Sequence, residues 1–159
     1  MERKILTENL SKDRRSKEKM IFSNIFVYSN MLQKIFNREI PILTLKQFML
    51  VALIRQINKP LTYTCAGKIL GSSRQNIRRI AESLEKEGFL TIEPMKEDKR
   101  AQNVFITPRA ERYFIEEFKD YERDLKYLFE VFDDEELGQF FNLMNKLSLG
   151  IESLDRRGH

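Results

Sequence analysis

The sequence predicts a mainly α-helical fold with one small β-hairpin, arranged as a winged helix-turn-helix flanked by N- and C-terminal helices. Three observations predict it. Two helices with capping boxes, near 44–57 and 72–88, enclose a short helical stretch at 63–70. The runs at 89–93 and 102–107 are rich in β-branched and aromatic residues and flank a polar loop, as in a hairpin. Apolar residues at heptad-like spacing mark long helices toward both ends of the chain.

The composition indicates one domain without a membrane span or disulfides. With 159 residues, of which 42% are hydrophobic, the chain can bury its own core, and we expect residues 17–159 to form one domain behind a charged N-terminal arm at 1–16. The longest apolar run, at 48–54, is far shorter than a membrane-spanning helix. The charged N-terminus lacks the apolar core of a secretory signal, and there is one cysteine, so we expect a cytoplasmic protein.

Charge is unevenly distributed along the chain. Residues 41–109 carry twelve basic and six acidic side chains, whereas residues 110–159 carry seven basic and thirteen acidic ones. A basic middle segment is typical of a surface that faces a polyanion. Ordinary surface charge is the alternative interpretation.

The elements follow in order. A helix from about 17 to 38 is predicted by the steps of four and three between apolar residues on one face, and it ends in a break at 37–43. Those residues are Ile21, Ile25, Tyr28, Leu32 and Ile35, and the face is widened by Phe22, Phe26, Met31 and Phe36. The next helix begins with the capping box Thr44-x-x-Gln47 and ends at the NKP of 58–60. The short helix at 63–70 is closed by Gly71.

The helix at 72–88, SSRQNIRRIAESLEKEG, is charged against its own dipole. Its predicted N-terminus is the capping box Ser72-x-x-Gln75, and Gly88 closes it. Three arginines occupy its first half and three glutamates its second half: Arg74, Arg78, Arg79, Glu82, Glu85 and Glu87. Each exposed charge at the wrong end of a helix costs roughly 0.3–1 kcal/mol. The arrangement is understandable if the N-terminal half meets a polyanion.

The outward face of this helix suits base recognition in DNA. Its apolar stripe consists of Ile77, Ile80, Ala81 and Leu84. At 100° per residue, Gln75 and Arg79 then point away from the core, flanked by Asn76 and Arg78. Arginine matches the paired acceptors of guanine, and glutamine or asparagine matches adenine, in the major groove. A solvated polar face is the alternative, but the adjoining short helix, turn and hairpin favour DNA.

The hairpin and the C-terminal helices complete the pattern. The hairpin tip offers Lys96, Lys99 and Arg100, of which the Arg100 guanidinium can enter a minor groove, although an ordinary solubilising loop is the alternative. Thr107-Pro108 is typical of a helix start. Two helices with coiled-coil-like seams follow over 110–154, with the acidic helix start DDEE at 133–136 between them. The repeating apolar residues are Phe114, Phe118, Tyr121, Leu125, Leu128 and Phe132, then Leu137, Phe140, Met144, Leu147, Ile151 and Leu154.

The runs LTLKQFMLV, LGSSRQNIRRIAESLEKEGFL and EDKRAQNVFITPRA resemble the MarR family of bacterial transcription regulators, over about residues 17–154. The most specific part is Asp98-Lys99-Arg100 before a strand that ends in Ile106-Thr107. The resemblance implies that 72–88 is the recognition helix, that Arg100 is the wing-tip contact, and that Asp98 braces the wing through an ion pair. It also implies a homodimer joined by dimerisation helices at 17–38 and 110–154, with 44–109 as the DNA-binding lobe.

Two positions depart from the family pattern and leave the effector open. Ala110 replaces a common glycine, and Cys65 replaces a leucine. The family often binds small aromatic or anionic molecules beside its dimerisation helices, and a candidate pocket is lined by Phe22, Phe26, Tyr28 and Tyr113. At helical spacing these rings are more often core or dimer seam. Cys65 is expected to be a buried, structural residue, since a sensor thiol needs exposure.

No catalytic, metal or cofactor site is predicted. The one histidine, His159, is the terminal residue, and the acids at 133–136 are interpreted as a helix start. The predicted function is therefore a homodimeric, sequence-specific DNA-binding regulator, a repressor that a small effector could relieve, on an operator that is an approximate inverted repeat. The alternative is a winged helix used for protein–protein docking. The predicted DNA-binding residues are Ser72, Ser73, Arg74, Gln75, Asn76, Arg78, Arg79, Lys96, Lys99 and Arg100.

Overall fold

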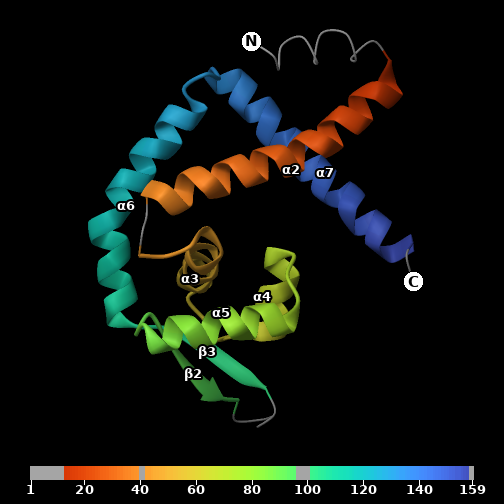
Figure 1. Cartoon of the computed structure of the whole chain (residues 1–159). Coiled ribbons are helices and arrows are strands. Elements are labelled where there is room, and N and C mark those ends of the chain that lie inside the picture. Colours follow the sequence, from red (N-terminus) through yellow and green to blue (C-terminus); the bar gives the residue numbers. More distant parts are fainter. Residues whose placement is uncertain (1–12, 40–41, 96–100, 158–159) are drawn as a thin grey trace. The chain divides into compact units, whose positions relative to one another are not determined.

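The computed structural model describes residues 13–39, 42–95 and 101–157. Within them the predicted mainly α-helical architecture with a small antiparallel sheet is confirmed (Figure 1). The elements in chain order are α2 (Arg14–Glu39), α3 (Leu45–Ile57), β1 (Leu61–Thr62), α4 (Tyr63–Leu70), α5 (Arg74–Lys86), β2 (Leu90–Pro94), β3 (Gln102–Ile106), α6 (Pro108–Phe129) and α7 (Asp134–Arg157).

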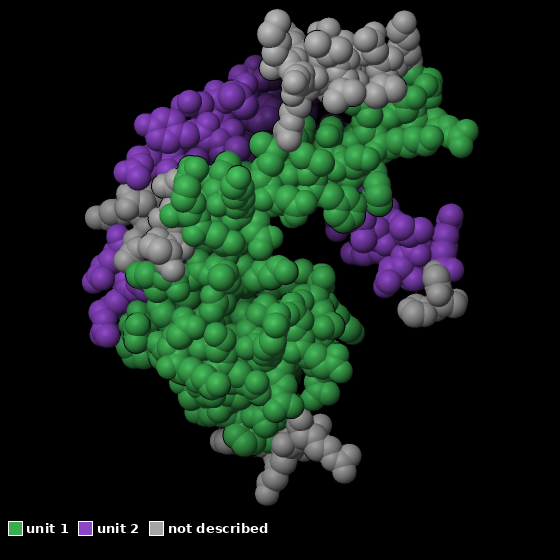
Figure 2. Space-filling view, viewed as in Figure 1, with its two compact units in different colours: residues 1–110 green, residues 111–159 purple. Residues whose placement is uncertain are grey.

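The chain divides into two compact units, residues 1–110 and 111–159 (Figure 2). The first unit contains α2, the helix-turn-helix and the sheet. Its hydrophobic core is formed mainly by α3, α4, α5 and the strands, and the largest fully buried side chains are Leu43, Leu50, Val51, Ile77, Leu84, Phe89, Leu90 and Val104. The second unit contains most of α6 and all of α7.

The sheet has three strands in the order β1-β3-β2, all antiparallel. The hairpin of β2 and β3 was predicted, and its register pairs Leu90 with Ile106 and Ile92 with Val104. Strand β1, which pairs Leu61 with Val104, was not predicted. A strand of two residues directly after Pro60 is too short to show the alternation of apolar and polar residues by which strands are recognised.

Capping side chains fix the boundaries of α3 and α4. The predicted capping box of α3 is confirmed: the Gln47 backbone N–H donates to Thr44 Oγ1 at 3.4 Å, and the Thr44 N–H donates to Gln47 Oε1 at 2.9 Å. Helix α4 is capped by Thr62 and closed by Gly71, which has a φ of 60°. The predicted short helix and its glycine end are therefore confirmed.

The predicted N-cap of α5 is wrong by one residue. Ser73, not Ser72, is the N-cap, and its hydroxyl accepts from the Asn76 backbone N–H at 3.2 Å. The Ser72 backbone N–H donates to Gly67 O at 2.8 Å, so Ser72 belongs to the turn that closes α4. Ser73 is consequently the first residue free to take the extended conformation that an N-cap needs.

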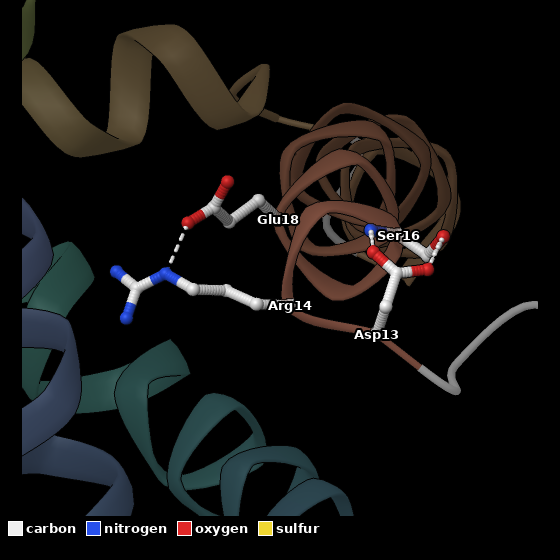
Figure 3. Close-up of polar contacts among 4 residues, drawn as sticks. All are labelled: Asp13, Arg14, Ser16 and Glu18. Carbon is white, nitrogen blue, oxygen red and sulfur yellow. Dashed lines mark hydrogen bonds and ion pairs between the residues drawn. The ribbon is translucent and has the colours of Figure 1, made fainter.

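Helix α2 begins at Arg14, earlier than the predicted 17, because Asp13 caps it. The Asp13 carboxylate accepts from the Ser16 backbone N–H at 3.0 Å and from its hydroxyl at 2.7 Å, and Arg14 pairs with Glu18 at 2.8 Å (Figure 3). The hydrogen bonds that Asp13 accepts from Ser16 lower the pKa of the Asp13 carboxyl.

The other end of α2 is tied to α3. The helix runs through the predicted break at residue 37 and ends at Glu39. Asn37 Oδ1 accepts from the Leu45 backbone N–H at 2.8 Å, and the rings of Phe36 and Phe48 lie 5.0 Å apart. Asn37 is therefore a helix residue whose amide satisfies one of the otherwise unpaired N–H groups at the start of α3.

Thr107 joins the end of α5, the sheet and the start of α6. Its hydroxyl donates to Gly88 O at 2.8 Å, with Phe89 O also within 3.1 Å, and accepts from the Ala110 backbone N–H at 3.2 Å. The predicted cap of α6 is thus confirmed. The Arg109 guanidinium stacks over the Phe89 ring, 5.1 Å from its centroid.

Replacing Thr107 with valine keeps its shape and removes these hydrogen bonds. We expect the variant to lose about 1–2 kcal/mol of unfolding free energy, because a helix cap and a hydrogen bond to Gly88 disappear together. Urea denaturation at a fixed protein concentration measures this change. Thr107→Ser keeps the hydroxyl and should retain most of the stability; equal losses in both variants would contradict the assigned role.

In the second unit, α6 ends at Phe129, so Phe132 lies beyond the helix that the apolar repeat had included. Its ring stacks on Phe140 of α7, with centroids 5.7 Å apart and planes 6° from parallel. The predicted acidic start of α7 is confirmed as a capping box: the Glu136 N–H donates to Asp133 Oδ1 at 2.8 Å, and the Asp133 N–H donates to Glu136 Oε2 at 3.1 Å.

Candidate nucleic-acid interface

Helix α5 has the two faces that its sequence predicted. Ile77, Ala81 and Leu84 are buried, whereas Ile80, the fourth residue of the predicted stripe, is half-buried. The side chains of Arg74, Gln75, Arg78 and Arg79 are exposed, while Ser72 and Asn76 are half-buried. The first turn of α5 contains no acidic residue, so its N-terminal half presents arginines, amides and free backbone N–H groups together.

Hydrogen bonds order part of this face. Arg79 Nη2 donates to Asn76 Oδ1 at 3.2 Å, and Asn76 Nδ2 donates to Ser72 Oγ at 2.8 Å. One turn along, Arg78 Nε pairs with Glu82 Oε1 at 2.7 Å, and this hydrogen bond raises the pKa of Arg78. Arg78 and Arg79 therefore each have a hydrogen-bond partner within α5.

The glutamates of the C-terminal half of α5 have structural partners, which the sequence did not predict. Glu85 Oε1 accepts from the Ile92 backbone N–H of the edge strand β2 at 2.8 Å. Glu87 Oε1 accepts from the hydroxyl of Ser83 at 3.0 Å and from Gln47 Nε2 at 3.3 Å. Glu85 and Glu87, which are unfavourable for the helix dipole, therefore connect α5 to the hairpin and to α3.

Gln47 has two roles, and the capping motif predicted only the first of them. Its Oε1 completes the capping box of α3, and its Nε2 reaches α5. No sequence pattern links Glu85 to Ile92. The donor is a backbone N–H, which almost every residue type has, so the residue type at position 92 does not indicate the hydrogen bond.

Helix α4 packs against α5 through an unusually close approach. A Cβ on Gly67 would lie 2.5 Å from the Ser72 carbonyl oxygen, so only glycine fits there. Tyr63 is buried beneath α5; its burial, and then the charge of Glu82, raise its pKa.

The expected burial of Cys65 is wrong: its side chain is exposed. The buried face of α4 consists of Tyr63, Ala66 and Gly67. Cys65 lies two residues beyond Tyr63, about 200° round the helix, and so points away from the core.

The predicted wing-tip residues Lys96, Asp98, Lys99 and Arg100 lie outside the described residues. The hairpin is described up to its last pair, in which the Met95 backbone N–H donates to Ala101 O at 2.9 Å. The wing-tip contacts and the Asp98 brace remain predictions.

The four residues of the predicted effector pocket come from different units. Phe22, Phe26 and Tyr28 are exposed on α2, where the first two rings meet edge to face at 5.1 Å, and Tyr113 is buried in α6. At 100° per residue, Tyr28 lies on a different side of α2 from Phe22 and Phe26. The pocket remains a prediction.

The described part of the chain contains neither a metal-binding cluster nor a membrane-spanning helix. Among residues 13–39, 42–95 and 101–157, no three histidine, cysteine, aspartate or glutamate side chains are grouped to hold a metal ion. In the same residues, no helix has the length and apolar content needed to cross a membrane.

Solved structures share this arrangement. The chain is similar to a MarR/EmrR family transcriptional regulator from Acinetobacter sp. ADP1, with 19% identity, a TM-score of 0.72, and coverage of 86% of this chain and 97% of that one. A MarR protein from Peptoclostridium difficile matches with 17% identity and a TM-score of 0.72, over 91% and 92% of the two chains. Bordetella bronchiseptica BpsR matches with 19% identity and a TM-score of 0.68, over 88% and 96%.

No protein-family model matches the sequence, and no curated protein does. The likeness is therefore one of three-dimensional structure, and it covers 86% to 91% of this chain in these three structures. The chain has the winged helix-turn-helix fold of the MarR family transcriptional regulators.

Proposed function

We propose that this protein is a homodimeric transcription regulator that binds double-stranded DNA at an approximate inverted repeat. The observation that carries the proposal is the N-terminal half of α5, where exposed Arg74, Gln75, Arg78 and Arg79 stand at a helix start without an acid in its first turn. In a winged helix-turn-helix, this is the helix that enters the major groove. Gln75 and Arg79 read base edges, while Ser72, Ser73 and Arg74 hold phosphates.

Dimerisation is supported by apolar surface that a single chain leaves uncovered. None of the residues of α7 is buried, and its seam residues Ile151 and Leu154 are 59% and 71% exposed. On α2, the heptad residues Ile21 and Tyr28 are more than half exposed. Apolar faces of this extent mark protein interfaces, and a second copy would cover them.

The wing and the effector belong to the same proposal. Lys96, Lys99 and Arg100 approach the adjacent DNA, and Arg100 enters the minor groove. The similar BpsR has its DNA binding regulated by 6-hydroxynicotinic acid. By analogy, a small aromatic or anionic molecule would release this regulator from its operator and so relieve repression.

The proposal is tested by measuring DNA binding with fluorescence anisotropy. The two duplexes are the intergenic DNA upstream of this protein's own gene and a scrambled sequence, each at two salt concentrations. Tight binding that prefers the native duplex, with log K falling linearly with log salt, supports the proposal. Absence of binding to either duplex at low salt would overturn it and favour the alternative, a winged helix that docks a protein.

Replacing Arg79 with alanine should relax base preference. We expect a loss of roughly tenfold or more on the operator and little change on scrambled DNA, since a bidentate contact to a base is worth about 1–3 kcal/mol. Arg74→Ala is the matched control, because loss of a phosphate contact should weaken binding to both duplexes alike and flatten the salt dependence. Equal losses on both duplexes for Arg79→Ala would remove it from the base-reading set.

A further inference from the structure

Asn76 lies on the proposed base-reading face, but its side chain is already engaged at both ends. Its Oδ1 accepts from Arg79 Nη2 at 3.2 Å and its Nδ2 donates to Ser72 Oγ at 2.8 Å. A guanidinium has donors only, so the amide atom that faces Arg79 must be the oxygen, and the orientation of the amide is fixed by its partners.

The other end of this chain of hydrogen bonds is anchored in backbone. Ser72 is half-buried, and its own N–H donates to Gly67 O at 2.8 Å. The Ser72 carbonyl lies where a side chain on residue 67 would be, so Gly67 permits the close turn. Asn76 therefore connects the exposed Arg79 to the turn in which Gly67 lies close to the Ser72 carbonyl.

On the basis of the proposed DNA-binding function, we propose that Asn76 is a positioning residue that sets the rotamer of Arg79, and that it does not itself read a base. A bidentate contact to adenine needs both Oδ1 and Nδ2 turned to the base edge. In Asn76 these atoms are turned to Arg79 and Ser72. Arginine loses rotamer freedom when it binds a base, so an Arg79 that is held beforehand binds with less entropic cost.

The test compares base-pair preferences among variants. An operator is first selected with the wild-type protein from a random duplex library, and dissociation constants are then measured for every single base-pair change. The proteins are wild type, Asn76→Ala, Asn76→Asp, Arg79→Ala and the double variant Asn76→Ala/Arg79→Ala. The N-cap survives in the alanine variant, because Ser73 accepts from the backbone N–H of residue 76.

We expect Asn76→Ala to lower discrimination at the same base pair as Arg79→Ala, by a smaller factor of roughly threefold to tenfold. The double variant should discriminate no worse than Arg79→Ala alone. Gln75→Ala serves as the matched control, since it should act at another base pair and combine additively with Arg79→Ala.

Asn76→Asp separates positioning from direct reading. A carboxylate can still accept from Arg79, and the Ser72 hydroxyl can turn to donate to it, so the discrimination should persist while the added negative charge weakens binding to all duplexes. A direct adenine reader would instead lose its preference in Asn76→Asp, because a carboxylate cannot donate to the adenine acceptor.

Two results would overturn the inference while leaving the proposed function intact: loss of preference at a base pair distinct from that of Arg79, or an unchanged profile in Asn76→Ala. Failure of the wild-type protein to select any duplex would overturn the proposed function itself. The two failures are therefore distinguishable.

Discussion

Replacing Gly67 with alanine is expected to disrupt the helix-turn-helix. The new Cβ would lie 2.5 Å from the Ser72 carbonyl oxygen. That oxygen belongs to the backbone of the turn, in which the Ser72 N–H donates to Gly67 O. Helices α4 and α5 must separate to accommodate the new Cβ. Such overpacking costs about 1–3 kcal/mol and exceeds the roughly 1 kcal/mol that alanine gains over glycine in a helix.

The measurements are the urea midpoint at a fixed protein concentration and the affinity for operator DNA. We expect a lower midpoint together with a loss of affinity, because the start of α5 moves with the turn. Gly138→Ala is the matched control: nothing lies within 4 Å of its added Cβ, so helix propensity alone should stabilise the protein slightly. A Gly67→Ala variant as stable as Gly138→Ala would contradict the close packing of α4 on α5.

Introducing two charges on the apolar seam of α7 is expected to abolish dimerisation. Ile151 and Leu154 are 59% and 71% exposed in the single chain, so Ile151→Glu/Leu154→Glu should not disturb the fold of one chain. In a dimer the same substitutions would bury unpaired carboxylates, which is strongly unfavourable. We expect monomers by analytical ultracentrifugation and a fall of roughly 100-fold or more in affinity for the inverted repeat, since the two half-sites are no longer bound together.

Asn142→Glu adds a carboxylate to the opposite side of α7, where residue 142 is also exposed, and should leave the dimer intact. A double variant that remained dimeric would exclude the seam of α7 from the interface. A monomer that retained full affinity would instead show that dimerisation is unnecessary for binding.

Sequence reasoning was most successful where a side chain caps the backbone locally. The box of Thr44 and Gln47 and the cap at Thr107 were predicted because capping depends on residues three positions apart. The buried stripe of α5 was equally readable, since a thirteen-residue helix repeats its apolar face often enough to define it.

The errors arise where tertiary contacts decide. Helix α4 has only eight residues, too few turns for periodicity to select its buried face, and Cys65 was assigned to the wrong side. The start of α5 is displaced because Gly67 captures the Ser72 N–H. Glu85 and Gln47 make hydrogen bonds to segments that become neighbours only when the chain folds, so no local sequence pattern predicts these contacts.

Strand β1 has a consequence for how the chain matures during synthesis. Leu61 pairs with Val104, so a loop of about forty residues that contains α4 and α5 must close before β1 can join the hairpin of β2 and β3. Non-local pairings of this kind form late and slow the folding of a domain. On the ribosome, the first unit would therefore acquire its final form only after residue 104 has left the exit tunnel, and a chain that terminated between α5 and β3 would contain α5 without the strand that completes the sheet.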